Sequence, residues 1–330
     1  MHPTRPLAAA ATSAAGLLTH ARAARGPAQP PRRSRRAAAI ALATVTLVTA
    51  GLAGAASARQ LGPWAPAVSA ESIPGTGSEL NTPFTDGCPM QSPDGLSLYM
   101  ASNRPGGLGG LDIWVASRAT TSEPFGNPVN LGAPINSGAD DFCPTPIRGK
   151  GLFFVSARVT AGACGGPDIY FSRRNPARGW TAPMNLGCGV NSAVGEAGPS
   201  YFEAGGQAYL YFSSGPDIYM SVQGSDGSFG ARTAVSELNT ASSELRPNVR
   251  KGGLEIVFDS DRPGTMGGAD LWFATRASVT DPWSTPVNAG SAINTGAGET
   301  RGSFSWDGAT LYFGRNPGPD GGSDIFVTTR

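Results

Sequence analysis

The chain has 330 residues, including 46 glycines and 28 prolines; only 15% are charged and 40% are hydrophobic. This composition is typical of a turn-rich globular fold and argues against both a helical bundle and a disordered chain. Residues 1–58 hold seven arginines and no acidic residue, which leaves 18 basic and 24 acidic side chains in residues 59–330. An acidic body lacks the positive surface that a phosphate backbone requires, so we expect no nucleic-acid partner.

Residues 1–58 have the pattern of a leader. The basic cluster Arg32–Arg36 precedes an uncharged Ala/Leu/Val run over residues 37–56, which ends in Ala56-Ser57-Ala58, a sequence that a signal peptidase accepts. We therefore expect cleavage after Ala58 and export of residues 59–330 as one domain, to the periplasm, the cell wall or the medium. The alternative is an uncleaved membrane anchor formed by residues 37–56, because about 20 apolar residues span a bilayer.

Two short sequence motifs, which we call words, recur through residues 59–330. One contains an Asn, and its five copies lie at regular intervals at Asn81, Asn136, Asn191, Asn239 and Asn294. The other is an Asp followed by two apolar residues, and it begins at Asp112, Asp168, Asp217, Asp270 and Asp324. Five copies of both words, in phase with each other, indicate a repeat architecture.

Each repeat of about 50 residues contains four short strand signals with turns between them. In the first repeat the turn at residues 92–95 precedes the apolar run 96–100, and a Gly-rich loop at 105–110 leads to the strand at Asp112. Similar apolar runs follow at 152–155, 209–212, 255–258 and 310–313. Short strands at even spacing are typical of propeller blades, so the sequence predicts an all-β, five-bladed β-propeller.

The two ends of the chain complement each other. The last repeat stops at Arg330, directly after its third strand, and the missing words occur instead at residues 64–68 and 80–82. We expect residues 64–82 to supply the outer strand of the final blade. This closure would remove the exposed strand edges that promote aggregation.

The turn Ser92–Gly95, followed by Ala101–Arg104 and Asp112–Trp114, resembles the WD40-like (PD40) repeat of TolB-type propellers. The resemblance covers residues 64–330. It implies an exported protein of a bacterial cell envelope, commonly a non-catalytic binding or scaffold part. The leading prediction is therefore a non-catalytic binding propeller, a monomer without a cofactor, that recognises a cell-envelope glycan or protein.

An acidic residue opens each blade. These residues are Asp86, Asp141, Glu196, Glu244 and Glu299. First strands line a propeller's channel, so we expect these carboxylates to ring one mouth as a ligand site, with Arg246 and Arg301 beside them. A structural alternative is that the carboxylates cap backbone amides at the strand starts.

The order Asp86, Asp141, Glu196 also resembles that of five-bladed inverting glycosidases of the arabinanase type. This resemblance gives the alternative function, a glycan-active hydrolase that uses the carboxylates of the mouth. An inverting glycosidase needs two carboxyl groups about 6.5–9.5 Å apart. Aromatic side chains such as Trp306 and Tyr201 could stack on sugar faces, although for Tyr201 we expect packing in the core instead.

Arginines follow the second strand in four repeats, at Arg104, Arg158, Arg262 and Arg315. We expect each to form an ion pair with the Asp of the next strand, respectively Asp112, Asp168, Asp270 and Asp324, and so to clamp the Gly-rich loop. The repeat of Asp217 lacks the arginine and has the shortest loop. An arginine ring for anionic ligands is the alternative.

The remaining signals concern cysteine and histidine. The two histidines, His2 and His20, lie in the leader, which excludes histidine-based catalytic triads, and the cysteine spacing predicts no metal site. Export permits disulfides, and we expect one between Cys164 and Cys188. Cys88 and Cys143 occupy one position in adjacent repeats and either bond to each other or remain thiols.

Overall fold

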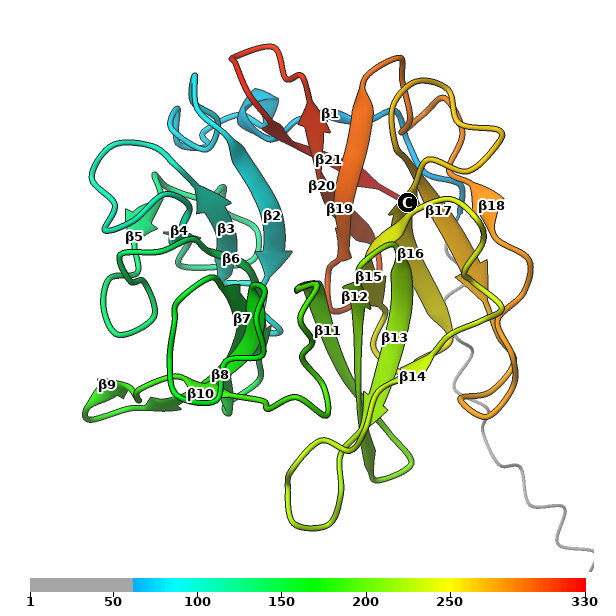
Figure 1. Ribbon diagram of the computed structural model, residues 1–330. Helices are drawn as coiled ribbons and strands as arrows, with labels where there is room; N and C mark the ends of the chain where they lie inside the picture. Colours follow the sequence, from blue (N-terminus) through cyan, green and yellow to red (C-terminus); the bar gives the residue numbers. More distant parts are fainter. Residues whose placement is uncertain (1–61) are drawn as a thin grey trace, which may run out of the picture. The chain divides into compact units, whose positions relative to one another are not determined.

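The structure, a computed structural model, describes residues 62–330. These residues form five antiparallel sheets, which Figure 1 shows as blades coloured in chain order. Each innermost strand contacts the innermost strands of two neighbouring blades, so the ring closes. The predicted all-β, five-bladed propeller is confirmed. The leader of residues 1–58, with its cleavage site and possible anchor, lies outside the described residues.

The strands of each blade run from the centre of the ring outward. Blade 1 contains β2 (Asp86–Gln91), β3 (Ser97–Ser102), β4 (Asp112–Ser117) and β5 (Val129–Asn130). Blade 2 contains β6 (Asp141–Ile147), β7 (Gly151–Ser156), β8 (Asp168–Asn175) and β10 (Met184–Asn185), with β9 (Gly179–Trp180) paired to β8. Blade 3 contains β11 (Glu196–Ala204), β12 (Gln207–Ser214), β13 (Asp217–Val222) and β14 (Thr233–Ala234).

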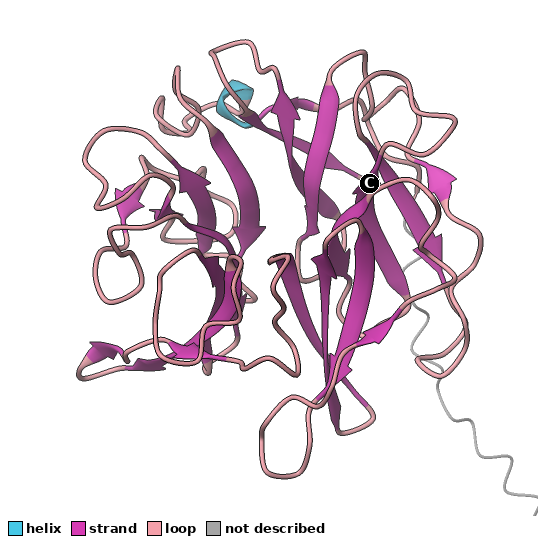
Figure 2. Cartoon of the chain, viewed as in Figure 1, coloured by secondary structure: helices cyan, strands magenta, loops and turns pink. Residues whose placement is uncertain are grey.

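Blade 4 contains β15 (Glu244–Val249), β16 (Glu255–Ser260), β17 (Asp270–Thr275) and β18 (Val287–Asn288). Blade 5 contains β19 (Gly298–Phe304), β20 (Thr310–Asn316), β21 (Asp324–Thr329) and β1 (Val68–Ser69). A single 3-10 turn, η1 (Ala70–Ser72), follows β1, and Figure 2 shows how strands dominate the described chain. No helix within residues 62–330 has the length and apolar character needed to cross a bilayer.

The amino-terminal segment closes the ring as predicted. Strand β1 pairs with β21, and Val68 lies opposite Val327. The N–H of Ala65 donates to the carbonyl of Thr329 at 2.8 Å, and the ring of Trp64 stacks on Phe273 of the neighbouring blade with 5.9 Å between centroids. Backbone pairing and aromatic packing therefore both fix this outer strand.

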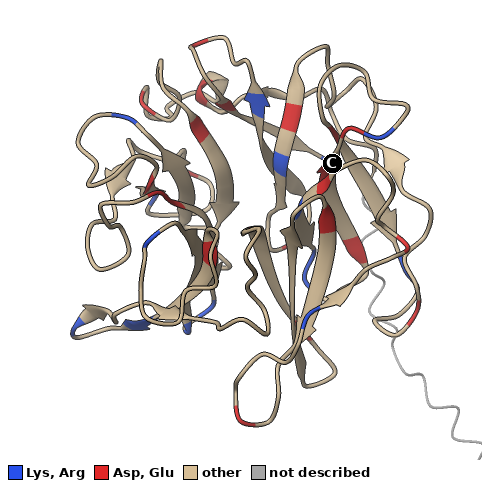
Figure 3. Ribbon diagram, viewed as in Figure 1, with Lys and Arg blue, Asp and Glu red and all other residues tan. Residues whose placement is uncertain are grey.

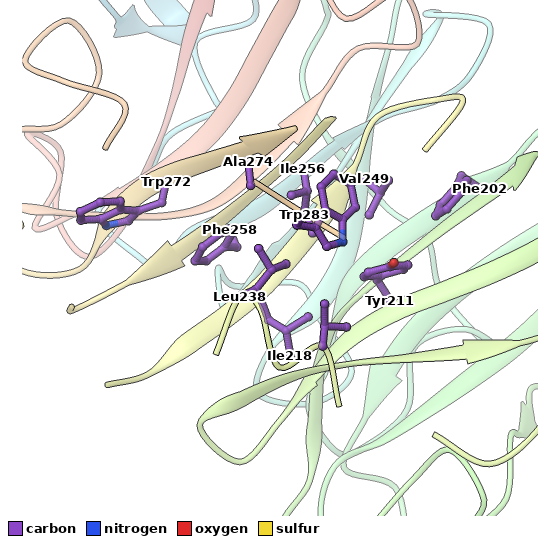
Figure 4. Packing of buried hydrophobic residues seen from close by; sticks show 11 residues of the cluster. Phe202, Tyr211, Ile218, Leu238, Val249, Ile256, Phe258, Trp272, Ala274 and Trp283 are labelled. Carbon is purple, nitrogen blue, oxygen red and sulfur yellow. The ribbon is translucent and has the colours of Figure 1, made fainter. Parts of the chain in front are cut away.

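Apolar side chains fill the spaces between neighbouring blades. Figure 4 shows one such cluster, in which Phe202, Tyr211 and Ile218 of blade 3 pack against side chains of blade 4 that include Phe258 and Trp272. Burying a side chain of this size contributes about 1.5–3 kcal/mol relative to leaving it exposed. Every blade shares such a cluster with its neighbours, so apolar packing joins all five blades.

The Asn word joins each blade to the next. The side-chain amide of Asn136 accepts from the N–H of Ile113 and donates to the carbonyl of the same residue, both at 2.9 Å. Corresponding pairs bond Asn81 to Ile325, Asn191 to Ile169, Asn239 to Ile218 and Asn294 to Leu271. The amide thus bonds both backbone groups at the start of a third strand, and in blades 1 to 4 the carbonyl also accepts from the residue that follows the outer strand, for example Leu131 in blade 1.

Replacing Asn294 by Ala would remove the acceptor of the buried N–H of Leu271, whose carbonyl keeps the N–H of Ala289 as a donor. We expect the free energy of unfolding to fall by about 1–3 kcal/mol, the cost of unsatisfied buried groups. Urea denaturation of the full chain measures this, with exposed Asn127→Ala as the control. Equal losses in the two variants would show that the Asn word does not hold the blades.

Candidate functional site

The five strand-opening carboxylates lie at the starts of the innermost strands, and their side chains have no exposed surface. Each accepts hydrogen bonds from the backbone N–H and the hydroxyl of a Ser or Thr four residues earlier. In blade 2, for example, Asp141 accepts from the N–H of Ser137 at 2.6 Å and from its hydroxyl at 2.7 Å. The carboxylates therefore bond backbone amides of the loop that enters each blade.

An arginine of the same blade completes this contact in four blades. The ion pairs are Arg104–Asp86 at 2.5 Å, Arg158–Asp141 at 2.6 Å, Arg262–Glu244 at 3.0 Å and Arg315–Glu299 at 2.7 Å. The predicted pairing of these arginines with the third-strand aspartates was wrong. The strand register explains the difference: Ser102 at the end of β3 lies opposite Asp86 at the start of β2, which places Arg104 beside Asp86.

The third-strand aspartates hold the Gly-rich loops through the backbone instead. Asp168 accepts from the N–H of Cys164 at 2.8 Å and from the side-chain amide of Asn185 at 2.6 Å. Asp112, Asp270 and Asp324 likewise accept from the N–H four residues earlier. Asp217, in the short loop of blade 3, is partly exposed.

Blade 3 departs from this pattern at Glu196. Its second strand is not followed by an arginine, and the carboxylate accepts from the hydroxyls of Ser192 at 2.6 Å and Ser214 at 2.9 Å. Arg232, which precedes the outer strand β14, approaches it at 3.2 Å with a side chain that is 29% exposed. Burial raises the pKa of Glu196 above its ordinary value, although these hydroxyl contacts oppose the shift.

Two residues farther along each innermost strand, a β-bulge turns the backbone into the left-handed region. The residues there are Cys88, Cys143, Gly198, Arg246 and Arg301, with φ between 47° and 61°. Bulges re-aim side chains, and here they direct them into the centre of the ring. The cavity between them has a volume of about 30 Å³, far below that of a ligand site for a sugar.

Arg246 and Arg301 meet at a residue that the sequence analysis did not single out. Asp259 forms an ion pair with Arg246 and accepts from the backbone N–H of Arg301 at 2.9 Å. Burial, together with the nearby Arg246, lowers the pKa of Arg301 to about 10. The signal that would have identified Asp259 is an acidic residue within the apolar run of a second strand.

Both disulfides lie in the first two blades. Cys164 bonds to Cys188, which confirms that prediction, and Cys88 bonds to Cys143 between the adjacent innermost strands β2 and β6. Two disulfides indicate an exported protein, because reducing compartments keep cysteines as thiols. Acidic and basic positions both occur along the described strands and loops (Figure 3), and no group of His, Cys, Asp and Glu in residues 62–330 is arranged to hold a metal ion.

Comparison with protein-family models and with curated proteins gave no match. Among solved structures, a thermostable family-43 glycoside hydrolase has a TM-score of 0.52 and 14% identity, with 78% of this chain and 90% of that chain covered. The Bacteroides ovatus xyloglucan PUL GH43B has a TM-score of 0.50 and 15% identity, with 76% of this chain and 53% of that chain covered. At this identity the likeness shows the shared five-bladed fold.

These neighbours correct the predicted function. They are glycoside hydrolases and not TolB-type propellers, which contradicts the leading prediction of a non-catalytic binding propeller. The alternative drawn from the order of Asp86, Asp141 and Glu196, a glycan-active enzyme, is taken up under the proposed function. Asp86, Asp141 and Glu196 open the innermost strands of three successive blades.

The raised pKa of Glu196 predicts a pH effect on stability. The folded state binds this proton more tightly than the unfolded state, whose pKa is near 4.5, so ionisation opposes folding. Relative to Glu196→Gln, the wild type should lose free energy of unfolding as the pH rises from about 4.5 through the folded pKa. Urea titrations from about pH 4 to about pH 7 measure the difference. Parallel curves for the two proteins would contradict the shift.

Proposed function

We propose that the chain is an exported glycoside hydrolase whose reacting groups are Asp86, Asp141 and Glu196. The observation that carries this proposal is the exception in blade 3. The arginine that follows the second strand of the other four blades is replaced there by Arg232, which reaches Glu196 from the outer part of the blade, and burial raises the pKa of Glu196. A fold shared with family-43 glycoside hydrolases supports it.

Glu196 is the general acid of this proposal. A carboxyl group whose pKa is raised keeps its proton at a higher pH and can donate it to the oxygen of the leaving sugar. In an inverting reaction, a second carboxylate accepts a proton from the water that attacks the anomeric carbon. Asp86 and Asp141, each ion-paired to an arginine of its own blade, are the carboxylates proposed for that role.

Arg232 controls access to Glu196 in this proposal. Its guanidinium lies 5.0 Å from the ring of Tyr219 and donates to the hydroxyl of Ser214 at 3.0 Å, so it covers the carboxyl group. A sugar that displaces Arg232 would offer its own hydroxyls to Ser214 and Glu196. Arg232 is thus a positioning residue that leaves when substrate enters.

The resemblance to PD40 repeats is retained as a proposal about the repeat words alone. The turn Ser92–Gly95 and the words around Asp112 account for strand and loop positions in the blade. They specify no ligand. We likewise propose that the protein is a monomer and that it acts outside the cytoplasm. Its disulfides support the second of these proposals.

The proposal predicts opposite results for two matched variants. Glu196→Gln removes the acid proton and should lower the hydrolysis of xylo- or arabino-oligosaccharides by about 10²–10⁴-fold. Glu244→Gln, at the same position in blade 4, changes a carboxylate that likewise accepts from the N–H and hydroxyl of the residue four positions earlier, and it should keep the wild-type rate if it folds. Product release is measured by chromatography, and circular dichroism checks folding.

Equal rates in the wild type and in folded Glu196→Gln would contradict the proposed acid. A wild type that releases no product from any oligosaccharide of the screen would contradict the hydrolase itself.

A further inference from the structure

A cavity opens on the axis of the ring at the end opposite the strand-opening carboxylates. The innermost strands run for six or more residues from those carboxylates, so at about 3.3 Å per residue the two ends are roughly 17–20 Å apart. At their far ends they enclose a cavity of about 370 Å³. Every blade contributes to its wall, through Gln91, Ile147, Glu203, Arg250 and Trp306 among others.

A second cavity lies beside the first, between blades 2 and 3. It has a volume of about 580 Å³ and shares Ile147, Lys150 and Tyr201 with the axial cavity. We call the two together the axial groove. Ligand sites in proteins commonly enclose about 300–1,000 Å³, so the axial groove is large enough for several sugar units.

The wall of the axial groove is strongly basic. Its six cationic side chains are Arg148, Lys150, Arg173, Arg174, Arg250 and Lys251, and the acidic residue among its lining residues is Glu203. The chain contains two lysines, and both lie in this wall. Residues 59–330 carry more acidic than basic side chains, so this concentration of positive charge runs against the composition of the domain.

Part of this charge is available to a ligand. Lys251 forms no ion pair with any residue of 62–330 and lies 4.6 Å from the ring of Trp306. Trp306 is 39% exposed, although large aromatic side chains are usually buried. A flat apolar ring beside a free ammonium group offers one surface for the face of a sugar and one for its negative substituent.

Glu203 organises the opposite wall. Its carboxylate accepts from both the ammonium group of Lys150 and the hydroxyl of Tyr201, and the Lys150 contact lowers the pKa of Glu203. The same contact raises the pKa of Lys150, which stays cationic. The side chains of Lys150 and Glu203 are each about half exposed. Lys150 therefore keeps hydrogen-bond donors for a ligand, while Glu203 and Tyr201 hold its ammonium group in place.

We propose that the axial groove binds an anionic oligosaccharide, with Lys150 and Lys251 on its carboxylate or sulfate groups and Trp306 against a sugar face. Cationic side chains form their strongest hydrogen bonds with such ionised acceptors. Neutral oligosaccharides have no ionised group to accept such hydrogen bonds. The site lies at the other end of the ring from Glu196 and does not depend on hydrolysis there.

The test measures binding of matched hexasaccharides to the full chain by calorimetry. The probes are an oligogalacturonate, a sulfated oligosaccharide and neutral xylohexaose. We expect at least one anionic probe to bind about tenfold or more tightly than xylohexaose, and to bind more weakly as salt increases. Preference between the two anionic probes identifies carboxylate or sulfate as the recognised group.

Variants locate the site. Lys251→Ala and Trp306→Ala should each weaken the anionic probe about tenfold, and Lys251→Arg should retain most of the affinity. Arg178→Ala removes an equal charge from an exposed turn outside the axial groove and should bind as the wild type does. Equal affinity for neutral and anionic probes, or losses as large in Arg178→Ala, would overturn the proposal. Each measurement can be repeated in Glu196→Gln, so its outcome is separate from that of the hydrolase.

Discussion

The buried carboxylate at the start of each innermost strand is the contact on which the propeller depends. In blade 1, Asp86 bonds the loop through Thr82, and Arg104 bonds both Asp86 and the carbonyl of Leu80 in the same loop. One cluster thus fixes the loop, the first strand and the end of the second. Removing one partner of a buried ion pair leaves an uncompensated charge and typically costs about 3–5 kcal/mol, so a blade that alters the pair must replace it. Blade 3 does so with Arg232.

Along the axis of the ring, the two ends and the middle of the innermost strands form three zones with different chemistry. Ion pairs occupy the first zone, and Glu196 is the carboxyl group there whose cation comes from outside the repeat pattern. The Cys88–Cys143 disulfide and the Arg246–Asp259 pair fill the second. The third opens into the axial groove. The cavity of about 30 Å³ in the second zone separates the two proposed sugar sites, which share none of their residues.

The sequence predicted the fold because the features that set it are local and repeated. Asp and Asn words recur in phase, and residues 64–82 matched the strand missing from the last blade. The ion pairs were assigned to the wrong aspartates because strand register, which brings Ser102 opposite Asp86, is a property of paired strands and not of spacing along the chain. The sequence did not predict the axial groove for a similar reason. Lys150, Tyr201 and Trp306 are far apart in sequence and meet only where three blades end.

The pH dependence of hydrolysis in Arg232→Ala tests the central claim most directly, because that claim makes Glu196 the proton donor and Arg232 its neighbouring cation. Removing a cation raises the pKa of a nearby carboxyl group. The account predicts that the alkaline limb of kcat/KM moves to higher pH in Arg232→Ala and stays in place in Arg178→Ala, which loses the same charge from an exposed turn. An alkaline limb that is unchanged in active Arg232→Ala would contradict it.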